Sequence, residues 1–212
     1  MGKLENLNDE VFERIKFIDK DLVLSNPLLV TSNSKGKILY LGQETNTWCG
    51  SHENYNSARE LEFEYDNYFL NDKMSNTLFW KYIREVTGYH DVARKGNITW
   101  ANLFICGNKD CKGTPVLYND IKDLSVYYLS NVVDILNIDK IISVVGPKNP
   151  YYEAINRLAS ELGCIINGYP TIRIPYAYSD NEKIFYTYHP MYLQKSKNFS
   201  SVVKVNKEFI SK

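Results

Sequence analysis

The sequence predicts an α/β protein of three layers, in which helices cover both faces of a central, mainly parallel sheet of four strands. Short apolar stretches alternate along the chain with longer segments whose apolar residues recur at helical spacing. Some of the short stretches end at a glycine, and the segments between them are long enough to be crossover helices. Because parallel strands need such crossovers, the alternation favours a parallel sheet.

The four expected strands are too short to be helices and are rich in β-branched and aromatic residues. They cover residues 38–41, 98–106, 139–146 and 184–188. A further extended segment is expected at residues 171–175. In a parallel sheet the carboxyl ends of these strands meet at one edge, which is where open α/β folds bind their ligands.

The expected helices carry their apolar residues on one face, and two of them have a clear end signal. They cover residues 8–19, 120–137, 151–162 and 200–210, and one more begins after Asn76 and ends at Gly88. Residues 50–73 lack a clean period and are expected to form a long loop with a helical piece. Long loops inside compact domains are often functional.

Length and composition predict one domain that spans residues 1–212. The chain has 212 residues, of which 44% are hydrophobic and 24% are charged, so it can bury a sizeable core. No apolar run reaches membrane-spanning length, and residues 1–10 lack the apolar stretch of a signal peptide. We therefore expect a cytoplasmic monomer without a membrane partner.

The four cysteines are scattered and form no Cys-x-x-Cys pair; they are Cys49, Cys106, Cys111 and Cys164. Reduced, structural thiols are the expectation for a cytoplasmic chain. Cys106 and Cys111 lie close in sequence, but they could hold a metal only with ligands from elsewhere. The sequence therefore predicts no metal site.

The formal net charge is zero, which does not favour a broad nucleic-acid binding surface, since phosphate contacts usually leave a basic footprint. Charge is nevertheless unevenly distributed. Lysines dominate from Gln194 to Lys212, whereas acidic residues dominate residues 52–72. Runs of this kind are most often solvated faces of the protein.

Polar residues lie in or directly after three of the expected strands. Gly42-Gln43-Glu44 follows the first strand, Asn102 lies in the second and His189 follows the last. Taken singly, Glu44 is a loop acid, Asn102 a buried amide and His189 a structural histidine beside a proline. Because the strand ends share one edge, the three together favour a site in a common crevice.

Three segments in chain order resemble motifs of the uracil-DNA glycosylase superfamily. Residues 42–46, Gly-Gln-Glu-Thr-Asn, are similar to its Gly-Gln-Asp-Pro-Tyr motif, and residues 98–103, Ile-Thr-Trp-Ala-Asn-Leu, resemble the strand with its base-reading asparagine. Residues 189–193, His-Pro-Met-Tyr-Leu, resemble the terminal His-Pro-Ser-Pro-Leu motif. The strand and glycine at 140–146 fit between them, so the resemblance covers much of the chain and implies that family's fold.

The resemblance implies that residues at this edge cleave an N-glycosidic bond. Glu44 would lie beneath the sugar, stabilise its developing positive charge and orient or deprotonate water. His189 would hydrogen-bond the base oxygen that gains negative charge. Asn102 can both donate to and accept from a base edge, and the turn at Gly42 and Gln43 would add backbone amides.

The resemblance also implies that the partner is DNA, single- or double-stranded, and that no cofactor is needed. The base must leave the stack, and Leu193, at the family's wedge position, could fill the vacated space. Pro190 and Tyr192 belong to the same DNA-contacting motif. Lys195 and Lys197 follow closely and could hold phosphates.

The chain departs from the family's first motif at two places. Glu44 stands where the family has Asp, and Thr45-Asn46 stands where it has Pro-Tyr. The family's tyrosine helps to exclude methylated bases, so the preferred base stays open between uracil and another modified base. Trp48 either replaces the lost wall by stacking on the base or packs in the core.

Two other functions stay open from the sequence. One is a non-catalytic protein on the same fold that binds a nucleic acid or a nucleotide, in keeping with the zero net charge and the altered Thr45-Asn46. The other is a hydrolase of free nucleosides or nucleotides, which would also account for the weak basic character.

Overall fold

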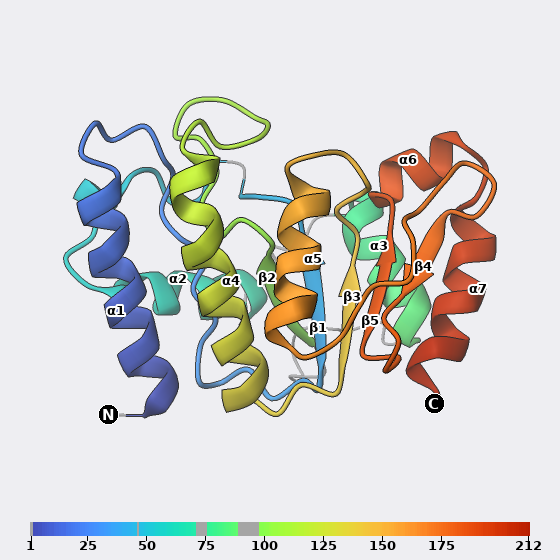
Figure 1. Cartoon of the computed structure of the whole chain (residues 1–212). Coiled ribbons are helices and arrows are strands. Elements are labelled where there is room, and N and C mark those ends of the chain that lie inside the picture. Colours follow the sequence, from blue (N-terminus) through green and yellow to red (C-terminus); the bar gives the residue numbers. More distant parts are fainter. Residues whose placement is uncertain (1, 46, 71–75, 89–97) are drawn as a thin grey trace.

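The computed structural model describes residues 2–45, 47–70, 76–88 and 98–212. Its centre is a sheet of five strands in the order β2-β1-β3-β5-β4, of which the first four run parallel (Figure 1). The strands are β1 (Ile38–Gly42), β2 (Ile98–Asn102), β3 (Lys140–Ser143), β4 (Tyr176–Tyr178) and β5 (Ile184–Thr187). The predicted α/β class with a mainly parallel sheet is confirmed.

The expected number of four strands is wrong, because β4 adds an antiparallel strand at one edge. The extended segment expected at 171–175 precedes this strand and does not itself join the sheet. A tight turn connects β4 to β5, and the Ser179 hydroxyl accepts the backbone N–H groups of Lys183 and Ile184 there. A strand of three residues is too short to show an alternating pattern in the sequence.

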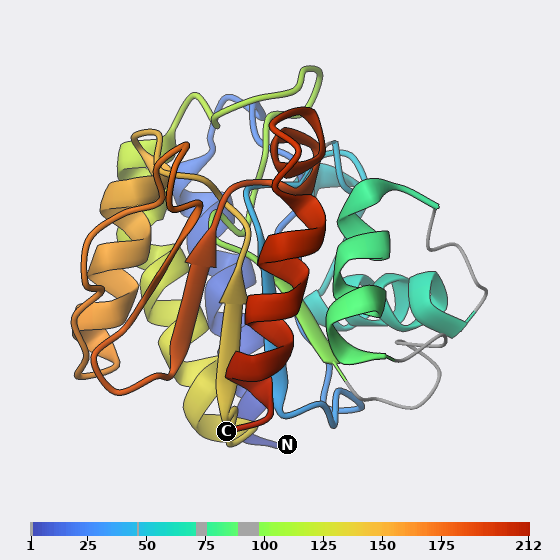
Figure 2. The same cartoon turned by 90° about the vertical axis from the view of Figure 1, so that its right-hand side faces the viewer.

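Helices cover both faces of the sheet, as expected. Figures 1 and 2 show α4 and α5 on one face and α3 and α7 on the other, with α1 packed beside α4. The helices are α1 (Lys3–Ile18), α2 (Ala58–Leu70), α3 (Leu78–Thr87), α4 (Tyr118–Ile135), α5 (Tyr151–Glu161), α6 (Pro190–Lys195) and α7 (Phe199–Ile210). A short 3₁₀ helix covers His52–Asn54.

The sequence predicts a loop with a helical piece for the segment 50–73. Of its described part, which ends at residue 70, the helix α2 (Ala58–Leu70) makes up more than half. Some acidic side chains of this helix hold the fold together, since Asp66 accepts a hydrogen bond from Thr31 at 2.7 Å. The hydroxyl of Tyr65 hydrogen-bonds both backbone groups of Trp100, at 3.0 and 2.8 Å. Helix α2 therefore satisfies the backbone groups of Trp100 at the open edge of β2, which would otherwise be unpaired.

The strand order places a topological switch point between β1 and β3. From β1 the chain crosses to β2 on one side, and it then returns past β1 to β3 on the other. At such a point the connections leave the sheet in opposite directions and open a crevice above the strand ends. Glu44 follows β1 directly at this edge.

Gly88 ends α3 in the left-handed region, at φ 71°, as the sequence predicts. Strand β2 is shorter than expected, because residues 103–106 leave the ladder; Leu103 and Phe104 instead donate to the carbonyls of Gly42 and Gln43. Among the described residues, no helix combines the length and apolarity needed to cross a membrane.

A buried hydrogen-bond network joins α1, α4 and the segment before β1. The hydroxyl of Tyr128 accepts the backbone N–H of Val30 at 2.6 Å and donates to Asn8 Oδ1 at 3.1 Å. The amide of Asn8 in turn donates to the carbonyl of Val30 at 2.9 Å and to Glu62 Oε1 at 2.8 Å. Buried polar groups that lose such partners are costly, so this network holds α1 in register.

Tyr128→Phe is expected to lower the free energy of unfolding by about 1–3 kcal/mol, because it leaves the buried N–H of Val30 without an acceptor. Urea unfolding measures the change. The matched control is Tyr127→Phe. The hydroxyl of Tyr127 donates to the exposed Glu10, so its loss should hardly change the free energy of unfolding. Equal losses in the two variants would contradict a special role for the buried network.

Candidate functional site

A cavity of about 480 Å³ lies at the carboxyl edge of the parallel strands. Gly42, Gln43, Glu44, Asn102 and His189 all line it. The expectation that the ends of β1, β2 and β5 bring these residues into one crevice is therefore confirmed. They come from the ends of three strands or from the turns that follow, so the sheet itself fixes their relative positions.

Glu44 lies half-buried in the cavity wall, with one carboxylate oxygen held from the side of α5. The hydroxyl of Tyr151 donates to Glu44 Oε2 at 2.5 Å. Burial raises the pKa of Glu44, and the hydrogen bond from Tyr151 partly opposes this by lowering it. The other oxygen makes no hydrogen bond with a described residue, which leaves it available to a ligand or water.

Tyr151 is itself fixed by its surroundings. Its ring packs edge-on against Phe104 at 5.6 Å, and its hydroxyl lies 3.3 Å from Thr114 Oγ1. Burial and the neighbouring Glu44 raise the pKa of Tyr151, so the phenol keeps its proton and acts as the donor of the pair.

Asn102 sits beside Gly42, its partner in the parallel register of β1 and β2. A Cβ at position 42 would lie 2.3 Å from Asn102 Oδ1, so the amide fits only against a glycine. Asn102 is 3% exposed, yet its side-chain amide makes no hydrogen bond with any described residue. A buried amide with unused donors and an unused acceptor is suited to a polar ligand in the cavity.

His189 caps the amino end of α6, and its Nδ1 accepts the backbone N–H of Met191 at 3.3 Å. This bond places the proton of a neutral ring on Nε2, which is then a donor. Burial lowers the pKa of His189, which favours the neutral form. The ring stacks near Phe79, with centroids 6.2 Å apart and an angle of 21° between the planes.

Aromatic side chains form the remaining wall. Trp48, Tyr68, Phe79 and Trp100 line the cavity. Trp48 is half-buried and lies edge-on to both Tyr68 and Trp100, at 5.8 Å in each case. It therefore packs against the core, as one of the two alternatives expected, and also lines the cavity, while stacking on a base stays a prediction.

The side chain of Gln43 spans the switch point, because its Nε2 donates to the carbonyl of Val145 at 2.8 Å. This bond ties the turn after β1 to the end of β3. Gln43 thus orients the turn through its side chain, while base binding through its backbone amide stays a prediction.

Thr45, which follows Glu44, is held in the core instead of facing the cavity alone: it is buried and hydrogen-bonds Ser25 Oγ at 2.8 Å. Asn46 lies outside the described residues.

The wedge role expected for Leu193 is wrong. Leu193 is 0% exposed and belongs to the hydrophobic core, where it anchors the short helix α6 to the body of the protein. Pro190 is also buried, as the first residue of α6, so it shapes the backbone and does not offer a surface. Tyr192, Lys195 and Lys197 are exposed, as DNA contacts would have to be.

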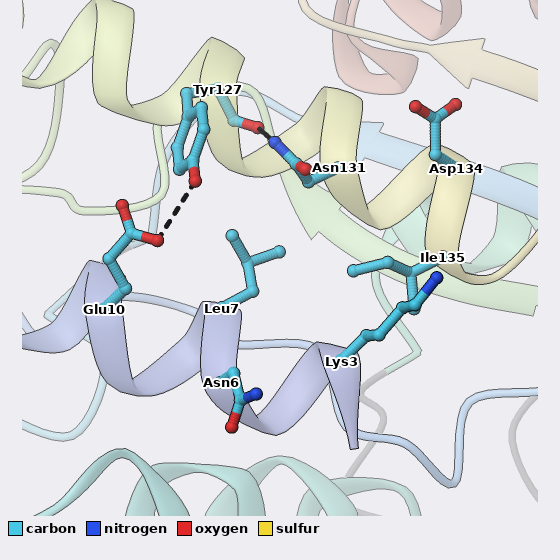
Figure 3. Close-up of a pocket in the computed structure, with 8 residues that line it drawn as sticks. All are labelled: Lys3, Asn6, Leu7, Glu10, Tyr127, Asn131, Asp134 and Ile135. Carbon is cyan, nitrogen blue, oxygen red and sulfur yellow. Dashed lines mark hydrogen bonds between the residues drawn. The ribbon is translucent and has the colours of Figure 1, made fainter. Parts of the chain in front are cut away.

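A second cavity, of about 430 Å³, lies between α1 and α4 and contains none of the predicted site residues (Figure 3). At one end the hydroxyl of Tyr127 donates to Glu10 at 3.0 Å, and Asn131 donates to the carbonyl of Tyr127 at 2.8 Å. Its polar groups thus partly satisfy one another on the outer surface of two helices.

All four cysteines are free thiols. Cys106 is buried and Cys111 exposed, and the part of the chain that the structure describes contains no group of three or more metal-binding side chains.

Comparison with known proteins finds no family model that matches the sequence and no similar curated protein.

Sequence reasoning missed several residues of the cavity. Phe79 and Trp100 read as core residues of a helix and a strand, Lys112 carried no signal, and Met191 lay in the segment 189–193 without a role assigned to it. Tyr151 could have been found, because it begins the helix that follows the glycine turn after β3. That position brings a helix start toward the same sheet edge as Glu44.

Tyr151→Phe is expected to raise the pKa of Glu44 further, because it removes the hydrogen bond that stabilises the carboxylate while burial remains. Carbon-13 NMR of the glutamate carboxyl groups during a pH titration measures the shift. Glu62, a partly buried carboxyl that hydrogen-bonds Asn8, is the internal control and should keep its pKa. A Glu44 pKa that falls or stays constant would contradict the conclusion that Tyr151 stabilises the Glu44 carboxylate.

Proposed function

We propose that the protein hydrolyses the N-glycosidic bond of uracil or another modified base flipped out of DNA. The observation that carries the proposal is the convergence of Glu44, Asn102 and His189 on one aromatic-walled cavity. A carboxylate, an amide with free donor and acceptor groups and a histidine donor are the groups that this reaction needs. The resemblance to the uracil-DNA glycosylase superfamily supports the same function.

In the proposed reaction the bond between the sugar C1′ and the base nitrogen breaks, and its electron pair stays with the base. The sugar gains positive charge, which the nearby carboxylate of Glu44 stabilises. A water molecule then bonds to C1′ through its oxygen and gives one proton to Glu44. That proton passes to the departing base, so the atoms and charges balance.

His189 and Asn102 act on the base. The neutral His189 ring donates from Nε2 to the base oxygen that gains negative charge when the bond breaks. Asn102 reads a base edge that presents one acceptor and one donor. Phe79, Trp48 and Trp100 offer apolar faces that exclude water, which strengthens these polar interactions.

Glu44→Gln is expected to lower base release by roughly 10²–10⁴-fold, because the amide can neither accept the proton nor stabilise the cation as strongly. Oligonucleotides that contain uracil, hypoxanthine or a modified cytosine are incubated with the protein, and abasic sites are cleaved with alkali and counted. The matched control is Glu208→Gln on the exposed face of α7, which should keep full activity.

A DNA-binding measurement and an assay with free nucleosides, run beside this experiment, separate the alternatives. Binding of DNA without abasic product would assign a non-catalytic role, whereas release of base from free nucleosides alone would assign a nucleoside hydrolase. If the wild-type protein left every substrate intact and Glu44→Gln changed neither binding nor turnover, the proposed function would be abandoned.

The reaction should fail at acid pH because it uses the carboxylate form of Glu44. Burial raises the pKa of this group, so activity is lost at a higher pH than an exposed glutamate would give. Tyr151→Phe should move this acid limb to still higher pH in a profile of kcat against pH. Tyr152→Phe, its neighbour on α5, should leave the limb in place.

A further inference from the structure

Exposed apolar side chains gather on two segments that lie at the carboxyl edge of the sheet. In the loop 168–174, Tyr169 is 59%, Ile172 69% and Ile174 60% exposed, and in α6 Met191 is 52% and Tyr192 40% exposed. Isolated exposed apolar residues are common on protein surfaces, but a cluster of five is not. We call the loop 168–174 and α6 together the edge surface.

The loop of the edge surface contacts the residues on both sides of α6. Tyr188, just before α6, donates from its hydroxyl to the carbonyl of Pro170 at 3.1 Å, and Asn198 donates to the carbonyl of Ile172 at 3.3 Å. The loop leads into Tyr176 of β4, which pairs with Thr187 at the carboxyl end of β5. The loop and α6 therefore lie at the same upper edge of the sheet in Figure 1.

The aromatic rings of the edge surface are held in place. Tyr192 stacks on Tyr188 with centroids 4.4 Å apart, and Tyr169 lies edge-on to Tyr152 at 6.0 Å. Rings that are already ordered lose little conformational entropy when a flat ligand packs on them. Met191 lines the candidate cavity as well, so the edge surface is continuous with the mouth of the site.

The charge of the edge surface has one sign. Residues 165–179 and 188–207 contain no aspartate or glutamate. Arg173, Lys195 and Lys197 are exposed there and make no ion pair with any described residue. Aromatic faces interleaved with unpaired cations match a strand that presents unpaired bases and phosphates.

We propose that the edge surface binds single-stranded nucleic acid, and that the bound strand is the one whose base enters the cavity. A duplex turns its bases inward and offers phosphates alone, whereas a single strand offers base faces to Tyr192, Ile172 and Ile174 as well. The inference rests on the proposed function only for the identity of the site, because the binding itself needs no catalysis.

The test uses fluorescence anisotropy with an unmodified oligothymidine and with its duplex, so it does not depend on base release. The wild-type protein should bind the single strand more tightly than the duplex. Tyr192→Ala and Ile172→Ser should each weaken single-strand binding, and loss of a base stack predicts roughly a five- to hundredfold effect for Tyr192→Ala. Replacement of Lys195 and Lys197 by alanine should reduce the salt dependence by about 0.7 per lost phosphate contact.

Phe17→Ser and Lys3→Ala are the controls, because both residues are exposed on α1, at the far side of the molecule in Figure 1. They should bind like the wild type. Equal affinity for duplex and single strand, or equal losses in control and edge variants, would overturn the proposal. So would self-association in sedimentation that Ile172→Ser abolishes, since the edge surface would then contact a second copy of the chain. Loss of base release with intact strand binding would count against the proposed function alone.

Discussion

The parallel pairing of β1 with a neighbour on each side is the constraint on which the site depends. Parallel register places Gly42 directly beside Asn102, and the same strand pairs with β3 on its other side. The turn after β1 is then tied to the end of β3 through Gln43. Glu44 can therefore face the cavity only because three strands end at one level, with a glycine where the amide of Asn102 needs room.

Burial acts in opposite directions on Glu44 and His189, which both line the cavity. It raises the pKa of Glu44 and lowers that of His189, so both are pushed toward their neutral forms. A neutral histidine with its proton on Nε2 is still a donor, but a neutral glutamate has lost its function as a base. The hydrogen bond from Tyr151 lowers the pKa of Glu44 and so partly offsets the effect of burial on the group that must stay ionised. The hydrogen bond between Tyr151 and Glu44 brings α5 to a site whose aromatic wall includes Phe79 of α3, on the opposite face of the sheet.

The sequence was sufficient for the features that follow from local pattern. Glycine after a short apolar run located Glu44, and the order of strands brought Asn102 and His189 to the same edge. Features that depend on tertiary packing were not accessible. The resemblance gave Leu193 the role of a wedge, but only the packed structure shows that α6 turns this side chain into the core. Strand β4 exists because β5 offers it an edge, and three residues carry no pattern that reveals this. The helix start at Tyr151 can be located from the glycine turn after β3, but its contact with Glu44 is a tertiary one that no local motif records.

The burial of Leu193 also explains how one short helix serves two surfaces. Because Leu193 and Pro190 are fixed in the core, α6 cannot move away from the sheet without exposing apolar area. His189, which caps this helix, is held at the cavity, while Tyr192 is exposed on the same turn and Met191 is both exposed and part of the cavity lining. A ligand that packs on the exposed side of α6 therefore contacts an element whose cap lines the site. The helix gives the edge surface and the cavity a fixed relative position, since both depend on the same buried anchor.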